Sequence, residues 1–161
     1  MHRGNLAQAS KLGVEPRPAT CNLPDGFQLR GWKGLDLDGL QASWSRLADR
    51  ASTPNAFFEA GFLVPSLSIF DPEGGVSLAL LVEGGQLRGV MPCTSRSDYH
   101  GRRLPHSANW LHANMFCGVP LVEAGYEEAF WTAYLATCHH LLGSSWFVHF
   151  SRLPADCTVT R

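Results

Sequence analysis

Lysine is nearly absent from this sequence, and no long run of basic residues occurs in it. Only Lys11 and Lys33 are lysines, and 13 basic residues stand against 14 acidic ones, for a formal net charge of -1. A protein that binds a phosphate backbone needs a basic surface. The composition therefore predicts that nucleic acid is not a partner.

Long apolar runs are also missing. No stretch approaches the ~20 apolar residues of a membrane helix. The polar N-terminus has no apolar core of the length that a signal peptide needs. These absences predict a soluble, cytoplasmic protein with no membrane partner.

Paired cysteine motifs are lacking. The five cysteines are odd in number and scattered, and no CxxC pair occurs among Cys21, Cys93, Cys117, Cys138 and Cys157. Structural zinc sites use closely spaced ligands, and disulfide frameworks belong to small secreted domains. We therefore expect reduced thiols and no metal site.

Neither of the glycine motifs that bind phosphate is present. The sequence has no match to GxxxxGK[ST] and none to GxGxxG. Gly84–Gly89 looks similar, but it lies in an expected hairpin turn with no helix after it, and phosphate binding uses the N-terminus of such a helix. We interpret these glycines as structural.

What is present indicates one α+β domain. The length suits a single domain, and 45% hydrophobic residues suffice for a core. Residues 1–25 are polar and predict a flexible lead, followed by a domain over residues 26–161. The clearest local signal is a β-hairpin at Val76–Cys93, with a tight turn at Gly84-Gly85 and an expected end at Pro92.

Other elements follow from periodicity and punctuation. Alternation predicts a strand over Phe27–Trp32, and apolar spacing predicts a helix after it, capped by Asp36 or Asp38. A second helix is expected from Glu59 to about Phe70, bent or interrupted at Pro65.

Residues 94–115 are polar and predict a loop. A third helix is expected from about Tyr126 to Leu142, with a stop at Gly143 and Glu127 and Glu128 favouring its first turn. The expected apolar face of this helix is Phe130, Tyr134, Leu135, Cys138, Leu141 and Leu142. A strand over Ser145–Phe150 follows it.

Histidines and cysteines are the candidate chemical groups. His100, His106 and His112 lie in the polar region, and adjacent His139 and His140 point about 100° apart on a helix, so they do not chelate one ion easily. We expect solvated or hydrogen-bonded histidines. A catalytic thiol needs a base within reach, which sequence proximity does not show.

Several segments together are similar to a known family. The segments are LQASWSRLADRA, STPNAFFEAGFLVPSL, VSLALLVEGGQLRGVMPC, WLHANMFCGVPLV and SWFVHFSRLPAD. Over about Phe27 to Asp156 the chain resembles the N-terminal half of CelD-type proteins of the GNAT acyltransferase superfamily. The resemblance implies a mixed, mostly antiparallel sheet with the hairpin at its centre and helices on its flanks.

The same resemblance implies acyl transfer from acetyl-CoA or another acyl-CoA to an amine or hydroxyl. In the family the acyl-CoA site belongs to the second half, and its R/Q-x-x-G-x-G/A signature is missing here. The chain would then be the acceptor-side half, whose partners are a small-molecule acceptor or a second GNAT-like half. Gly118–Leu121 and the loop before it would face the cleft between halves. The implied acceptor contacts are Trp110, His112, Asn114 and Cys117, and no catalytic residue is identified.

Two other hypotheses remain open. The chain is alternatively a catalytically silent binding or scaffold module, which binds a protein partner or a second copy through exposed Trp32, Phe57 and Trp146. The third hypothesis is a metal or thiol hydrolase that uses the histidine-rich region.

Overall fold

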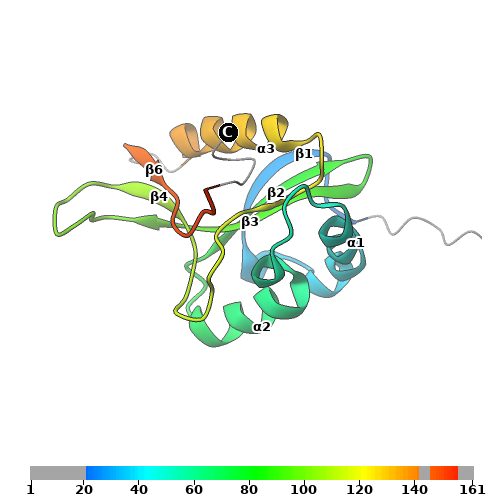
Figure 1. Cartoon of the computed structure of the whole chain (residues 1–161), viewed down its shortest axis with the longest axis horizontal. Helices are drawn as coiled ribbons and strands as arrows, with labels where there is room; N and C mark the ends of the chain where they lie inside the picture. The colour runs from blue at the N-terminus through cyan, green and yellow to red at the C-terminus, as the bar shows by residue number, and fades with distance from the viewer. Residues whose placement is uncertain (1–20, 142–145, 156–161) are drawn as a thin grey trace, which may run out of the picture.

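A computed structural model describes residues 21–141 and 146–155, with side chains up to residue 138 in the last helix (Figure 1). One six-stranded sheet has the order β1-β2-β3-β4-β6, and β5 pairs with β3 on the side. The elements are β1 Gly26–Gly31, α1 Leu37–Arg50, α2 Ala60–Phe70, β2 Ser77–Glu83, β3 Gln86–Arg96, β4 His106–Asn109, β5 Leu121–Val122, α3 Glu127–Leu141 and β6 Phe147–His149, with 3-10 turns at Trp32–Gly34 and Ala56–Phe58. The predicted α+β class with a mostly antiparallel sheet is confirmed.

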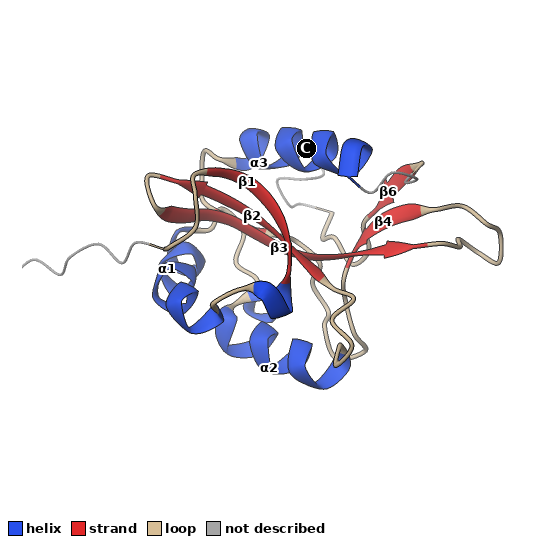
Figure 2. Ribbon diagram, turned by 180° about the vertical axis from the view of Figure 1, so that it is seen from behind, coloured by secondary structure: helices blue, strands red, loops and turns tan. Residues whose placement is uncertain are grey.

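The helices form two layers around this sheet. Figures 1 and 2 show α3 on one face and α1 and α2 on the other. The end of the sheet that contains β4, β6 and the β3–β4 connection projects past α1 and α2 (Figure 1). This end of the sheet is therefore left without a helix on the α1–α2 side.

The predicted hairpin is confirmed as the centre of the sheet. Gly84 and Gly85 have φ values of 59° and 66°, which glycine adopts without steric cost. The Asp25 carboxylate accepts hydrogen bonds from both of their N–H groups at 3.0 Å, and Cys21 N–H donates to the Gly85 carbonyl at 2.7 Å. The turn thus already holds an anion from its own chain, and residues 21–25 of the expected lead lie against it. Residues 1–20 lie outside the described residues.

Pro92 does not end the return strand, which corrects our expectation. β3 continues to Arg96, and Pro92 pairs with Leu78 inside the ladder. Its carbonyl accepts from Trp110 N–H at 2.8 Å, on the side away from β2. Because the nitrogen and carbonyl of one strand residue point to the same side, the missing N–H removes no bond to β2.

The polar region 94–115 is not one loop, which is a second correction. Its residues 106–109 form β4, whose four side chains are all buried despite the sequence His-Ser-Ala-Asn. β4 pairs antiparallel with β3 and parallel with β6. Ser107 Oγ lies 2.8 Å from Tyr134 Oη on α3, so the polar strand buries its groups as hydrogen-bonded pairs.

The first two helices match their predictions except at Pro65. Asp36 caps α1 by accepting from Gly39 N–H at 3.0 Å, and Trp44 on its buried face donates to the Phe58 carbonyl at 2.9 Å. Pro65 does not interrupt α2. It lies on the exposed side, where water can hydrogen-bond the carbonyl that loses its partner.

The third helix and the surface aromatics differ in detail from expectation. Phe130, Tyr134 and Cys138 of α3 are buried as predicted, but Leu135 is 47% exposed because the sheet covers a narrower face than the apolar pattern suggests. The side chains of residues 139–141 and the stop at Gly143 lie outside the described residues. No helix in the described residues is long and apolar enough to cross a membrane.

Trp32 and Phe57 are half-buried, so our expectation that these two aromatic side chains are exposed was wrong. Trp32 donates its indole N–H to Asp71 at 2.7 Å, and the Phe57 ring packs on Phe62 with centroids 5.2 Å apart. Trp146 is 73% exposed as predicted. Pairing with a second copy stays a prediction.

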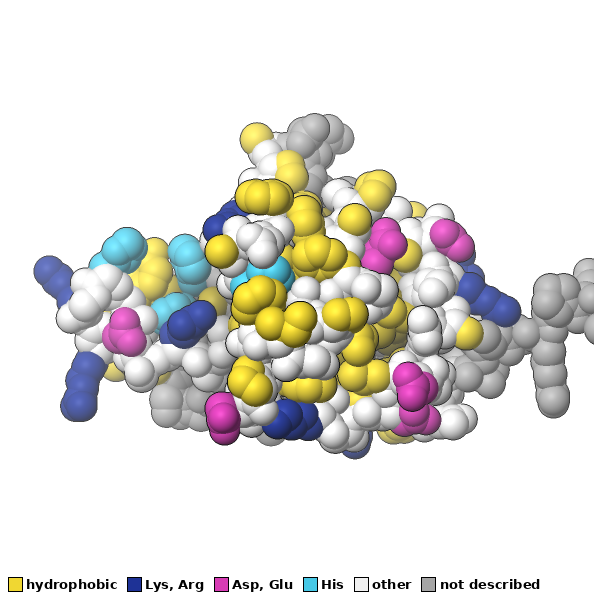
Figure 3. All heavy atoms as spheres, turned by 90° about the horizontal axis from the view of Figure 1, so that it is seen from below, with side chains coloured by type: hydrophobic (Ala, Val, Ile, Leu, Met, Phe, Trp, Pro, Cys, Tyr) yellow, Lys and Arg dark blue, Asp and Glu magenta, His cyan; other side chains and the backbone are white. Residues whose placement is uncertain are grey.

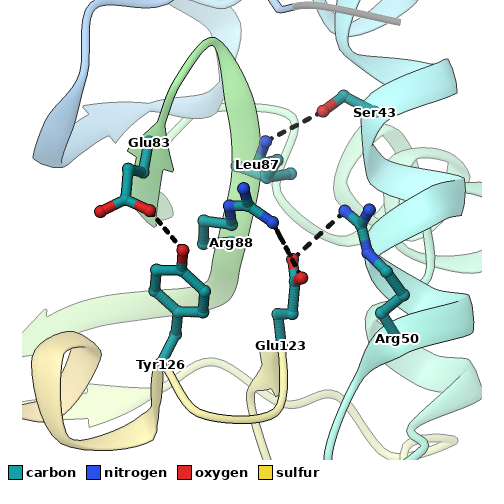
Figure 4. A network of polar contacts seen from close by, with 7 residues as sticks. All are labelled: Ser43, Arg50, Glu83, Leu87, Arg88, Glu123 and Tyr126. Atoms are coloured by element: carbon teal, nitrogen blue, oxygen red, sulfur yellow. Dashed lines mark hydrogen bonds and ion pairs between the residues drawn. The ribbon is translucent and has the colours of Figure 1, made fainter. Parts of the chain in front are cut away.

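A charged network attaches the segment before α3 to the sheet (Figure 4). Glu123 accepts two hydrogen bonds from Arg88 at 2.7 and 2.8 Å and pairs with Arg50 at 3.2 Å. The hydrogen bond to Glu123 raises the pKa of Arg88. Arg88 also lies 4.9 Å from the ring of Tyr126, whose hydroxyl donates to Glu83. These contacts hold the segment that leads into α3 in one position.

Candidate functional site

A short segment is inserted where β4 and β6 stop pairing. The parallel pair runs from His106 to Ala108, and beyond it the Asn109 side chain replaces backbone pairing. Its amide donates to the carbonyls of Gly118 and Ser151 at 3.1 and 3.0 Å and accepts from Ser151 N–H at 3.1 Å. Gly118 N–H donates to the Arg152 carbonyl at 2.9 Å. The space between the two strand ends is thus filled by the chain itself.

Asn55 holds the same segment from its other side. Its amide donates to the carbonyls of Cys117 and Val119 at 3.3 and 2.6 Å. All of Gly118–Leu121 is buried within this domain, so this segment does not present a surface to a neighbouring half. The expectation that it faces a cleft is corrected for these four residues, because the two asparagines and the pairing of Leu121 with β3 enclose them.

The four predicted acceptor contacts differ in how far they are exposed. Trp110 is 8% exposed, and its ring lies 5.6 Å from that of His112. Asn114 is exposed, while Cys117 is partly buried. None of the four lines the pocket described below, and whether they contact an acceptor stays a prediction.

His112 instead belongs to an aromatic surface beside α2. Its ring stacks on Phe70 at 4.2 Å and on Phe62 at 6.0 Å. Phe116 nearby is 74% exposed and contacts Phe57. Figure 3 shows hydrophobic side chains gathered on this face of the molecule, with a histidine among them.

Acid is expected to weaken the fold through His112. Burial, and next the charge of Arg152, lower the pKa of His112 below its ordinary 6.5. Its Nδ1 accepts from Asn114 N–H at 3.3 Å, and its Nε2 is buried without a partner. The unfolded chain binds a proton near pH 6.5 while the folded chain resists it, so stability is full above that pH and is lost as pH falls toward the folded pKa. Urea midpoints of the wild type should drop more steeply between pH 7.5 and about pH 5.5 than those of His112→Phe. Equal pH slopes for the two proteins would contradict this, because the wild type and His112→Phe have all their other histidines in common.

A pocket of about 360 Å³ opens on the uncovered end of the sheet. We call it the β4–β6 pocket; it is lined by Arg96, Tyr99, His100, His106, Ala108 and His149, among others. Arg96 pairs with His106 across β3 and β4, and Ala108 pairs with His149 across β4 and β6. Paired residues share one face of a sheet. The small Ala108 between larger side chains leaves the hollow.

His106 is oriented within this pocket. Its Nδ1 lies 3.0 Å from the Leu104 carbonyl, and a carbonyl only accepts, so the proton of the neutral ring is assigned to Nδ1. The ring stacks on Phe147 at 4.9 Å, with Tyr99 edge-on at 5.3 Å. This orientation leaves Nε2 as an acceptor for a ligand N–H or O–H group.

Sequence reasoning named His106 only as a loop histidine and missed the pocket. The residues come from β3, β4, β6 and the connection between β3 and β4, and their shared face depends on register. The available signal was the alternation of His106 and Ala108 with Ser107 and Asn109, which is weak in so short and polar a segment.

Known protein structures match this chain over most of its length. A solved GNAT family acetyltransferase from Staphylococcus aureus matches 84% of this chain and 93% of its own, with a TM-score of 0.52 and 12% identity. This chain has a GNAT-like fold. Two further matches have TM-scores below 0.5: glucosamine-6-phosphate N-acetyltransferase from Arabidopsis thaliana (0.46, 10% identity, 84% of both chains) and an aminoglycoside antibiotic 6'-N-acetyltransferase from Acinetobacter haemolyticus (0.47, 8% identity, 83% and 82%). No protein-family model and no curated protein sequence matches the chain.

These identities establish a likeness of fold alone, so the finer resemblance to CelD-type proteins stays a prediction. A GNAT-like fold raises the question of whether the residues present suit an acyl-CoA. Its pyrophosphate would need free N–H groups at the start of a helix. All four N–H groups of residues 123–126 already donate within the chain, to Arg88 O (2.8 Å), Arg50 O (3.2 Å), Glu127 Oε2 (2.8 Å) and Glu123 O (3.0 Å), respectively.

The charge at the start of α3 is also wrong for a pyrophosphate. Glu127 and Glu128 both lie in its first turn. Burial acts to raise the pKa of Glu127, but hydrogen bonds from its own N–H, Ser52 and Gly125 outweigh it and lower the pKa, so this carboxylate stays ionised. Two negative charges already interact with the helix dipole there. The segment 123–126 therefore offers no free N–H group to the pyrophosphate of an acyl-CoA, and the two acids in the first turn of α3 repel it.

A metal centre finds no support in the described part of the chain. No group of three or more His, Cys, Asp or Glu side chains there is arranged to hold an ion. Burial raises the pKa of Cys93 to about 12 and also raises that of Cys138, which is the opposite of an activated thiol. Neither Cys93 nor Cys138 is therefore an activated thiol, and a hydrolase that uses another thiol of the histidine-rich region stays a prediction.

Proposed function

We propose that this GNAT-like domain binds the acceptor in an acyl transfer and leaves the acyl-CoA to another domain or chain. The acceptor, a small-molecule amine or alcohol, would lie in the β4–β6 pocket. The observation that carries this proposal is the segment before α3, where all four N–H groups of residues 123–126 are occupied. The open pocket and the fold support the acceptor role.

The chemistry of the pocket suits an amine or hydroxyl group. His106 Nε2 can accept a hydrogen bond from such a group, because Nδ1–H is directed to the Leu104 carbonyl. Tyr99 and Phe147 pack around the imidazole and restrict its rotation. The residues of this chain would thus bind and orient the acceptor, and His106 Nε2 would accept a hydrogen bond from its amine or hydroxyl group.

Isothermal titration of the full chain with acetyl-CoA tests this proposal. We expect no saturable heat at millimolar ligand, since the loop before α3 offers neither a free N–H nor a positive charge. A GNAT acetyltransferase that binds acetyl-CoA, measured in the same buffer, is the positive control. Saturable binding that an excess of inorganic phosphate does not displace would contradict the proposal.

A further inference from the structure

The lining of the β4–β6 pocket includes one arginine, Arg96, three histidines and one acid, Asp98. Arg96 and His106 are direct partners on neighbouring strands, so their side chains emerge side by side on the pocket face. His149 emerges on the same face beside Ala108. His100, Ser151 and the acid Asp98 also line the pocket. Arg96 and Ser151 supply hydrogen-bond donors here, whereas the N–H of His106 is directed to the Leu104 carbonyl.

The surrounding arm is positive in an otherwise acidic chain. Residues 96–105 contain three arginines, Arg96, Arg102 and Arg103, against one acid, Asp98, which is a net charge of +2. The whole chain has -1, so the rest carries -3. Figure 3 shows arginine or lysine and histidine side chains gathered on the projecting end of the molecule. A local field of this sign attracts anions.

Arg96 is available for a ligand. Its side chain is exposed, and it takes no part in the ion pairs that Glu123 makes with Arg50 and Arg88. A guanidinium presents donors in a planar fork that matches the two oxygens of a carboxylate or phosphate. The forked donors of Arg96 thus border a hollow of about 360 Å³.

We propose that the β4–β6 pocket binds a small molecule that carries a carboxylate or phosphate group, with Arg96 as its charge partner. This inference rests on the proposed function for the second part of the ligand, an amine or hydroxyl that donates to His106 Nε2. The acceptor class is therefore an amine or alcohol that is also an anion.

Titration of the full chain with inorganic phosphate and with acetate, at ionic strength held constant with NaCl, tests the anion site. We expect saturable binding of at least one probe and a loss of about tenfold or more in Arg96→Gln, the effect of one hydrogen-bonded charge. Phosphate binding alone identifies a phosphate-bearing ligand, and acetate binding alone identifies a carboxylate. Arg96 is an exposed arginine, and so is Arg30, which is changed in the control variant below, so both variants are expected to keep the fold.

Arg30→Gln is the matched control, since Arg30 is an exposed arginine on β1, at the other edge of the sheet. It should bind both probes as the wild type does. Failure of both probes to bind, or equal weakening in Arg30→Gln, overturns the anion site. Neither result bears on the proposed lack of an acyl-CoA site. Conversely, acetyl-CoA binding that survives Arg96→Gln would contradict the proposed function and leave the anion site intact.

Discussion

Replacement of Asn109 by alanine is expected to lower the free energy of unfolding by about 3–5 kcal/mol. The buried amide serves three backbone groups, the carbonyls of Gly118 and Ser151 and the N–H of Ser151. Alanine leaves all three without this partner at a site that is 5% exposed, and each lost buried partner costs ~1–3 kcal/mol. A domain of ordinary stability, roughly 5–15 kcal/mol, would lose a large part of it.

Urea unfolding followed by tryptophan fluorescence measures this effect. Asn114→Ala is the control, because Asn114 is exposed a few residues away, and it should stay within about 0.5 kcal/mol of the wild type. If Asn109→Ala is as stable as the control, the side chain does not close the end of the β4–β6 pair as we describe.

Gly118→Ala should be the other strongly destabilising substitution. A Cβ at this position would lie 2.2 Å from the Ser151 carbonyl oxygen and 2.3 Å from the Asn109 amide nitrogen. One of these neighbours is backbone and the other is held by its hydrogen bonds, so neither can move freely. Overpacking of this kind costs about 1–3 kcal/mol or more, and we expect about 3 kcal/mol here because the amide bonds of Asn109 would be lost with it.

Gly61→Ala provides a contrast with the opposite sign. Gly61 is exposed within α2, and a Cβ there would meet nothing within 4 Å. Alanine should raise the stability by roughly 0.5–1 kcal/mol, because it restricts the unfolded chain and suits a helix. Thermal unfolding of the two variants side by side would therefore separate them in opposite directions from the wild type. A Gly118→Ala protein that melts with the wild type would refute the close approach.

Local signals were sufficient for the hairpin and the helices. The Gly84-Gly85 turn demands positive φ, and the apolar strands on both sides of it can pair only as an antiparallel hairpin. Asp36 and the spacing of Leu40, Trp44 and Leu47 define α1 in the same way. In these elements the decisive contacts lie within a few residues or on one uninterrupted apolar face.

β4 and its pocket escaped prediction because their stability depends on distant partners. His106 and Asn109 are polar, and their burial is tolerated only because Leu104, Gly118 and Ser151 satisfy them. The expectation for Pro92 was wrong for a related reason. Whether its missing N–H matters depends on which neighbouring strand the nitrogen faces, and the sequence does not show this.

The sequence by itself determined the hairpin, the amphipathic helices and the absence of a phosphate-binding glycine motif, because each depends on residues close together in the chain. Only the tertiary structure decided that Asp25 occupies the hairpin turn, that residues 123–126 have no free N–H and that Arg96, His106 and His149 share one face. These facts depend on hydrogen-bond partners and strand register between segments as many as 74 residues apart (Ala124 and Arg50), which local pattern does not encode.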